Sequence, residues 1–158
     1  MEVVENEILY HISRRDNKIY SSGEHIETAG YNPFFSVYDE LEVWFDTDNR
    51  SLLQGLTYYW HYAREIVLEE IRIKVNPELP SRLKCLWLCD VKSLDYWMFK
   101  LNYSPETHQV LEVSASGKLF NADATFIEGN PKKLNTVRES GLRYWKGEKS
   151  GNNKVEYL

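Results

Sequence analysis

Apolar and polar positions near the start of the chain predict a strand followed by loops. Residues 8–13 (ILYHIS) are β-branched and aromatic, which is typical of a strand. Alternation divides them into one face with Ile8, Tyr10 and Ile12 and another with Leu9, His11 and Ser13. Residues 14–23 are charged and polar and predict a loop. Residues 24–50, which include a glycine, a proline and an acidic stretch, predict a second loop with room for one short helix.

The clearest helical pattern covers residues 52–73. This segment lacks proline, follows possible N-caps at Asp48, Asn49 and Ser51, and is closed by Pro77 and Pro80. Apolar residues at 3, 4 spacing predict one packed face, with Leu56 and Trp60 beside it. That face contains Tyr59, Ala63, Ile66, Val67 and Glu70.

The next segments predict strands. Residues 83–90 (LKCLWLCD) are nearly all apolar and predict a buried strand. Residues 94–103 are aromatic and fit either a strand or a short helix. Residues 108–116 alternate as a strand, after which we expect Gly117 to turn the chain and residues 118–127 to form a hairpin partner.

The last segments predict a basic loop at 131–135, a short helix at 137–146 and a frayed tail from about residue 150. Strands and helices do not alternate regularly, which argues against a doubly wound parallel sheet. We therefore expect an α+β fold with a mixed, mostly antiparallel sheet and one long helix. Residues 1–158 read as a single domain, with its core at about 8–147.

Composition narrows the function. The chain has 19 Lys and Arg against 24 Asp and Glu, so its net charge is −5. Non-specific DNA or other nucleic-acid binding is not expected, because phosphate contacts need clustered basic residues. Aromatic residues make up 14% of the chain, and this excess fits either a core rich in rings or a stacking platform for a base.

The cysteines and the N-terminal residues bear on location. Cys85 and Cys89 share one apolar run, which predicts reduced structural thiols. The four histidines are scattered, so we expect no metal. Residues 1–7 do not follow the order of a signal peptide, and no apolar run approaches the ~18 residues of a membrane span. We expect a cytoplasmic protein without membrane contact.

Common catalytic motifs are absent: the chain has no GxGxxG, GxxxxGK[ST], HExxH or GxSxG. A few polar residues on predicted strands remain as candidates. His11 is either a half-buried histidine bound to backbone or a ligand-binding group. Arg82, preceded by Ser81, either pairs with a carboxylate such as Glu78 or clamps a phosphate through two N–H groups. Glu112 stands mid-strand, where it either faces solvent or needs a partner.

These segments together resemble a known family. ILYHIS, EIVLEEIR, PELPSRLKCLWLCD, HQVLEVSAS and the terminal YWKG follow the pattern YHI…E..R…PSR…YW.G. Over about residues 8–147 the chain resembles an uncharacterised bacterial and phage domain family with this pattern. That family in turn resembles a divergent ADP-ribosyltransferase-like fold, in which the first strand bears a His or Arg and a late strand bears a glutamate.

The resemblance implies an enzyme that uses NAD as substrate and needs no metal. It implies that His11 holds the NAD ribose, that Arg82 with Ser81 holds the dinucleotide, and that aromatic rings such as that of Tyr10 frame the nicotinamide. Glu112 would be the catalytic glutamate that stabilises an oxocarbenium-like state. The chain departs from the family at Val110, which stands where a Glu-x-Glu or Gln-x-Glu pair would begin.

Three functions follow as alternatives. The first is an ADP-ribosyltransferase-like enzyme that transfers ADP-ribose from NAD to a protein or nucleic-acid acceptor. The second is a catalytically inactive domain that binds NAD, ADP-ribose or another nucleotide, in the setting of bacteria–phage conflict. The third is a protein-interaction module whose aromatic residues mark a binding surface. The position of Glu112 separates them, since a glutamate in open solvent argues against the transfer mechanism.

Overall fold

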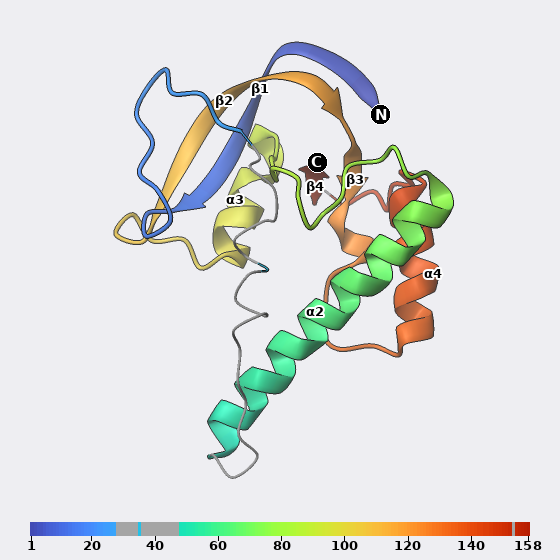
Figure 1. The fold of residues 1–158 in the computed structure, drawn as a ribbon. Helices are drawn as coiled ribbons and strands as arrows, with labels where there is room; N and C mark the ends of the chain where they lie inside the picture. Colours follow the sequence, from blue (N-terminus) through green and yellow to red (C-terminus); the bar gives the residue numbers. More distant parts are fainter. Residues whose placement is uncertain (28–34, 36–47, 153) are drawn as a thin grey trace.

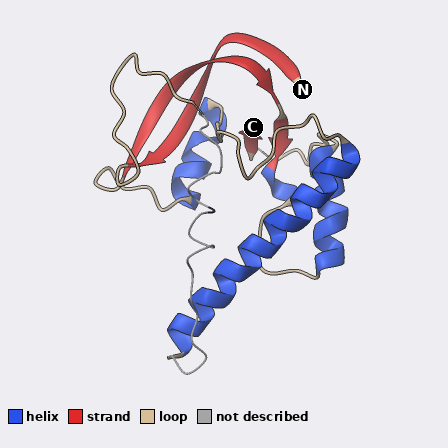
Figure 2. Ribbon diagram, in the orientation of Figure 1, coloured by secondary structure: helices blue, strands red, loops and turns tan. Residues whose placement is uncertain are grey.

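The computed structural model describes residues 1–27, 35, 48–152 and 154–158. These residues form an α+β fold, as expected, with helices beside two small antiparallel sheets (Figures 1 and 2). The strands are β1 (Glu2–Arg14), β2 (His108–Leu119), β3 (Asn121–Asp123) and β4 (Val155–Tyr157). The helices are α2 (Asn49–Val75), α3 (Val91–Lys100), the short 3-10 helix η1 (Ala124–Phe126) and α4 (Leu134–Trp145).

The sheets differ from the predicted mixed sheet. In the described residues β1 pairs only with β2, and β3 pairs only with β4, both antiparallel. The expected long helix corresponds to α2, but α3 and α4 accompany it. The expected loop at 24–50 falls largely outside the described residues.

The β1–β2 pair confirms two predicted strands and corrects a predicted turn. Tyr10 lies opposite Glu112 and His11 opposite Leu111. Gly117 does not turn the chain, because β2 runs through it and Gly117 pairs with Val4. The hairpin partner predicted at 118–127 is therefore wrong: β2 continues to Leu119, and the short strand that follows pairs with the C-terminal β4.

Helix α2 is confirmed, but its packed face is not the predicted one. Asp48 is the N-cap and accepts hydrogen bonds from the N–H groups of Arg50 and Ser51. Tyr59, Ile66 and Glu70, which were expected to be packed, are exposed. The buried face instead carries apolar residues together with charged ones, which are paired in the interior; it consists of Gly55, Glu65, Val67, Leu68, Ile71 and Arg72.

The main core lies between α2, α4 and the segment around η1 (Figure 1). Trp145 is fully buried and its indole N–H donates to the carbonyl of Leu68 at 2.8 Å. Gly141 faces α2, where a Cβ would lie 2.8 Å from side-chain atoms of both Ile71 and Leu68. The absence of a side chain at Gly141 therefore sets how closely the two helices approach. The predicted short helix at 137–146 corresponds to α4.

The strand predicted at 83–90 is wrong. A turn forms first, in which the N–H groups of Lys84 and Cys85 donate to the carbonyl of Ser81. Only two residues then make bridges, and to different sheets: Leu88 to Tyr157 and Cys89 to Tyr10. The run lies between the two sheets and belongs to neither, and Leu88 and Cys89 are its buried residues.

The segment after this run is helical, which settles the strand-or-helix alternative left open for residues 94–103. Helix α3 starts after Asp90, whose side chain accepts from the N–H of Ser93. The indole of Trp97 donates to the carbonyl of Val155 at 2.9 Å. Helix α3 is therefore attached to β4.

The described C-terminal residues pack against the rest of the chain, although a frayed tail was expected there. Ser150 donates twice to the buried carboxylate of Asp123 at 2.7 Å. Leu158 is buried and exchanges backbone hydrogen bonds with Phe120. No helix in the described part of the chain is both long and apolar enough to cross a bilayer.

Candidate functional site

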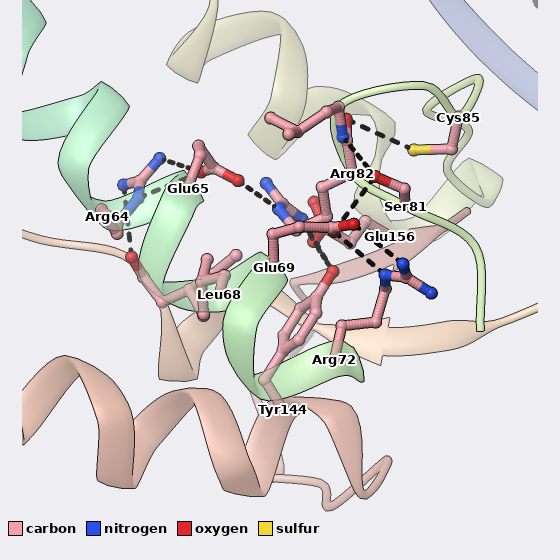
Figure 3. A network of polar contacts seen from close by, with 12 residues as sticks. Arg64, Glu65, Leu68, Glu69, Arg72, Ser81, Arg82, Cys85, Tyr144 and Glu156 are labelled. Atoms are coloured by element: carbon pink, nitrogen blue, oxygen red, sulfur yellow. Dashed lines mark hydrogen bonds and ion pairs between the residues drawn. The ribbon is translucent and has the colours of Figure 1, made fainter. Parts of the chain in front are cut away.

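Arg82 lies at the centre of a buried polar network (Figure 3). Its Nε donates to Glu65 at 2.7 Å, and its Nη1 donates to the Tyr144 hydroxyl at 2.7 Å and to the Glu156 carboxylate. All four residues are at most 6% exposed. The network joins α2, the turn after Ser81, α4 and β4.

Each carboxylate of the network has two partners. Glu65 accepts from Arg82 through one oxygen and from Arg64 through the other, at 2.7 Å. Glu156 accepts from Arg82 and from the Tyr144 hydroxyl. The guanidinium groups of Arg64 and Arg82 therefore face the carboxylates of Glu65 and Glu156. The four charges sum to zero.

Burial and pairing act together on the pKa values. Burial alone would raise the pKa of Glu65, but the adjacent charges of Arg82 and Arg64 hold it below its ordinary value. Burial opposes the charge on Arg82, yet Glu156 and Glu65 raise the pKa of its guanidinium well above the ordinary value. Burial and Glu156 raise the pKa of Tyr144, which therefore stays a hydroxyl donor.

Ser81 belongs to a neighbouring cluster. Its hydroxyl donates to Glu69 at 3.0 Å, and Glu69 also accepts two hydrogen bonds from Arg72. Arg72 in turn donates to the carbonyls of Pro77 and Leu79. Ser81 thus holds the loop after α2 in place.

The structure changes what Arg82 can do. The ion pair with Glu78 that was expected from the sequence is wrong, because Arg82 pairs with Glu65 and Glu156 instead. Since Nε and Nη1 are occupied, the guanidinium cannot offer the two-pronged grip expected for a phosphate. Its Nη2 donates to none of the described residues, so it can still give single hydrogen bonds. The guanidinium carbon lies 5.3 Å from the centre of the Trp87 ring.

His11 approaches the same tryptophan. Its Nδ1 lies 2.9 Å from the carbonyl oxygen of Trp87, and since a carbonyl only accepts, Nδ1 carries the proton. Burial lowers the pKa of His11, although the hydrogen bond to Trp87 opposes this. His11 is therefore a neutral imidazole at pH 7, with an Nε2 lone pair that can accept. It is also the half-buried, backbone-bound histidine that was one of the two alternatives.

Tyr10 and Glu112 lie elsewhere. They face each other across the β1–β2 pair, and the Tyr10 hydroxyl donates to Glu112 at 3.2 Å. Because successive residues of a strand point to opposite faces, Tyr10 lies on the other face of β1 from His11. Glu112 is exposed. The structure thus places His11 at the backbone carbonyl of Trp87 and Arg82 over its ring, and Glu112 contacts neither of them.

Sequence reasoning missed several residues of this site. Trp87 was considered only as one of several aromatic residues near the resemblance, and Tyr144 only as part of the YWKG pattern. Glu65 had a usable signal, since with Glu69 and Arg72 it forms a charged row at 3, 4 spacing along α2. Glu156 had none, because its segment was expected to be frayed.

The described residues offer no separate metal or thiol chemistry. They contain no group of three or more His, Cys, Asp or Glu side chains placed to hold a metal ion. Cys85 and Cys89 are not joined in a disulfide, and burial raises the pKa of each to about 12. Neither is a poised nucleophile.

Comparison with known proteins gives a family match. A family model described as "Protein of unknown function (DUF2441)" matches residues 9–158. The match runs from β1 through β4 and so includes the whole Arg82 network and His11. No curated protein matches the chain.

Proposed function

The chain belongs to the family described as "Protein of unknown function (DUF2441)", and from its own residues we propose that it is a nucleotide-binding domain that does not transfer ADP-ribose. Its ligand is NAD, ADP-ribose or a related nucleotide. One observation carries the proposal: His11 and Arg82 both contact Trp87, whereas Glu112 faces solvent on the opposite face of the β1–β2 pair. A cytoplasmic location, where thiols stay reduced, belongs to the proposal.

Each of the three residues contributes a different kind of contact. His11 Nε2 accepts a hydrogen bond from a ribose hydroxyl, and Arg82 Nη2 donates one to a phosphate or carbonyl oxygen. The Trp87 ring supplies aromatic contact area. Since the carboxylates of the network cancel the arginine charges, binding depends on hydrogen bonds more than on net charge. We therefore expect only a weak dependence of affinity on salt.

Binding without transfer follows from the position of the carboxylates. Breaking the nicotinamide–ribose bond develops positive charge on the ribose, which a nearby carboxylate must stabilise. Glu112 is engaged by Tyr10 and lies on the exposed face. Glu65 and Glu156 are buried and already paired. We therefore favour the inactive binding domain over the transferase.

Calorimetric titration with NAD and with ADP-ribose tests the proposal, together with an assay for nicotinamide release. We expect binding without release. Loss of one hydrogen bond in H11A should weaken binding roughly tenfold. The matched control is E112Q, on the neighbouring strand, which should bind like the wild type.

Three results would contradict the proposal. Nicotinamide release that E112Q abolishes would show a transferase with Glu112 as its catalytic residue. If neither NAD nor ADP-ribose binds, the proposed nucleotide-binding function is wrong, and the protein-interaction module is the function that remains. If a nucleotide binds H11A and the wild type equally well, its binding site does not include His11 and lies away from Trp87.

A further inference from the structure

Strand β2 has one edge that no other part of the described chain pairs with. Tyr10, which lies opposite Glu112 on β1, exchanges both of its backbone hydrogen bonds with Cys89, at 2.8 and 2.9 Å. Facing residues of an antiparallel pair alternate between bonded and non-bonded, so Tyr10 and Glu112 are a non-bonded pair. The backbone N–H and C=O of Glu112 therefore point away from β1. The same alternation directs outward the backbone groups of Ser114, Ser116 and Lys118.

This outer edge of β2 is open to solvent. The four residues whose backbone groups point outward are all exposed, from Glu112 to Lys118. Among the described residues, nothing takes part in hydrogen bonds with these outward groups. The side chains of Val113 and Ala115, between them, face the other way and pack against a small core. A row of unpaired backbone groups along an exposed strand is a template for adding another strand.

The charges along this edge favour a second copy of the same strand as the occupant. Glu112 and Lys118 lie at equal distances on either side of Ala115. If two β2 strands pair antiparallel with Ala115 facing its own copy, each Glu112 faces the Lys118 of the other copy. Opposite charges directly across two strands stabilise their pairing. Every other antiparallel register of this edge loses both of these charge pairs.

The rest of the edge is compatible with this register. Charged residues on an edge often prevent pairing, but here the two charges have opposite signs and match by symmetry. Among the described residues, Lys118 has no carboxylate partner and Glu112 accepts only from the Tyr10 hydroxyl. Ala115 would face Ala115, and Val113 would face Gly117. These small residues let the two backbones approach to the spacing of a sheet.

We propose that β2 pairs antiparallel with β2 of a second copy, about a two-fold axis at Ala115. Glu112 exchanges two backbone hydrogen bonds with Lys118 of the other copy, and Ser114 does the same with Ser116. The two β1–β2 pairs (Figure 1) thereby become one four-stranded sheet. The edge contains no residue of the proposed nucleotide site, so the dimer does not rest on that proposal.

Sedimentation velocity of the full chain at increasing concentration tests the proposal, and we expect a dimer. K118E places like charges opposite each other at both ends of the paired segment, so it should weaken the dimer roughly tenfold or more. The double variant E112K/K118E restores opposite charges and should dimerise again. The matched control is K92E on α3, an exposed lysine away from this edge, which should dimerise like the wild type. Circular dichroism shows that each variant is folded.

Amide hydrogen exchange, followed by nuclear magnetic resonance, tests the register without any variant. The N–H groups of Glu112, Ser114, Ser116 and Lys118 should become protected as the concentration rises, whereas those of Val113 and Ala115 should be protected throughout by β1. Dimerisation that survives K118E, or a folded double variant that stays monomeric, would overturn the proposal. A wild type that is monomeric at millimolar concentration would also overturn it and would leave this edge to an extended segment of another protein.

Discussion

Glu65 and Arg82 form an ion pair in the protein interior, where Nε of Arg82 donates to Oε2 of Glu65 at 2.7 Å. Both side chains are almost wholly buried, so each charge depends on the other for the hydrogen bonds that water would otherwise supply. The pair fixes the turn after Ser81 against α2. That turn leads directly to Trp87, which contacts both Arg82 and His11.

Removing Glu65 should destabilise the protein strongly. In E65A, Arg82 stays buried with one of its two carboxylate partners gone, and Arg64 loses its carboxylate partner as well. We expect a loss of about 3–5 kcal/mol in the free energy of unfolding, measured by urea denaturation. Glu70 lies on the same helix but is exposed, so E70A should change stability by no more than about 0.5 kcal/mol. Equal effects of the two substitutions would contradict a structural role for the buried pair.

Gly141 should not tolerate alanine. Although alanine favours helix, its Cβ would lie 2.8 Å from Ile71 and Leu68 side-chain atoms in the core. We expect G141A to lower the melting temperature and to cost about 1–3 kcal/mol by overpacking. I71V removes one of the two atoms in conflict, so the double variant G141A/I71V should recover part of the loss. A double variant whose loss is the sum of the single losses would argue against this contact.

His11 should make the protein less stable as the pH falls. Burial lowers the folded-state pKa of His11 below the ordinary 6.5, so the unfolded chain takes up this proton first. At pH values above 6.5, His11 is neutral in both the folded and the unfolded chain, so it does not change the free energy of unfolding. As the pH falls from there toward the folded-state pKa, the free energy of unfolding decreases.

A ring-proton titration by nuclear magnetic resonance checks this directly, and its midpoint for His11 should lie below 6.5. Urea denaturation of H11N across the same range should show a smaller dependence on pH than the wild type. His61 also has a pKa lowered by burial, so H61N serves as the comparison. A His11 midpoint at or above the ordinary value would refute the prediction.

Both cysteines should react slowly in the folded protein. Burial raises the pKa of Cys85 and Cys89 to about 12 from 9.0, which reduces the reactive thiolate roughly 1,000-fold at neutral pH. Labelling with a thiol reagent should be nearly absent in buffer and complete in concentrated urea. Rapid labelling of either thiol without denaturant would show that the surrounding segment opens readily.

Much of the secondary structure could be predicted because periodicity reports directly on it. Alternation located the second half of β1 and most of β2, and the 3, 4 spacing with the Asp48 cap located α2. The packed face of α2 was missed because it contains Glu65 and Arg72, whereas sequence patterns treat charged positions as exposed. The run at 83–90 was misread because burial between two sheets and burial within one leave the same apolar signature.

The candidate site was predicted only in part for a related reason. His11 stood out as a polar residue in an apolar run and Arg82 as a basic residue at the entry to one, and the structure places both against Trp87. The partners of Arg82 are distant in the sequence, with Glu65 17 positions away and Glu156 74 positions away. Spacing along the chain carries no information about such contacts. Glu112 looked unusual within a strand, but its strand has one face in solvent.

The pairing of β1 with β2 also has a consequence for the order of folding. Tyr10 and Glu112 are 102 residues apart, so forming this sheet closes a very long loop, and loop closure is entropically unfavourable. Contacts between residues so far apart in the chain slow folding. We expect the helices to form first and shorten the distance between the strands. During that interval β1 is an unpaired strand, the kind of segment through which chains associate wrongly before they are fully folded.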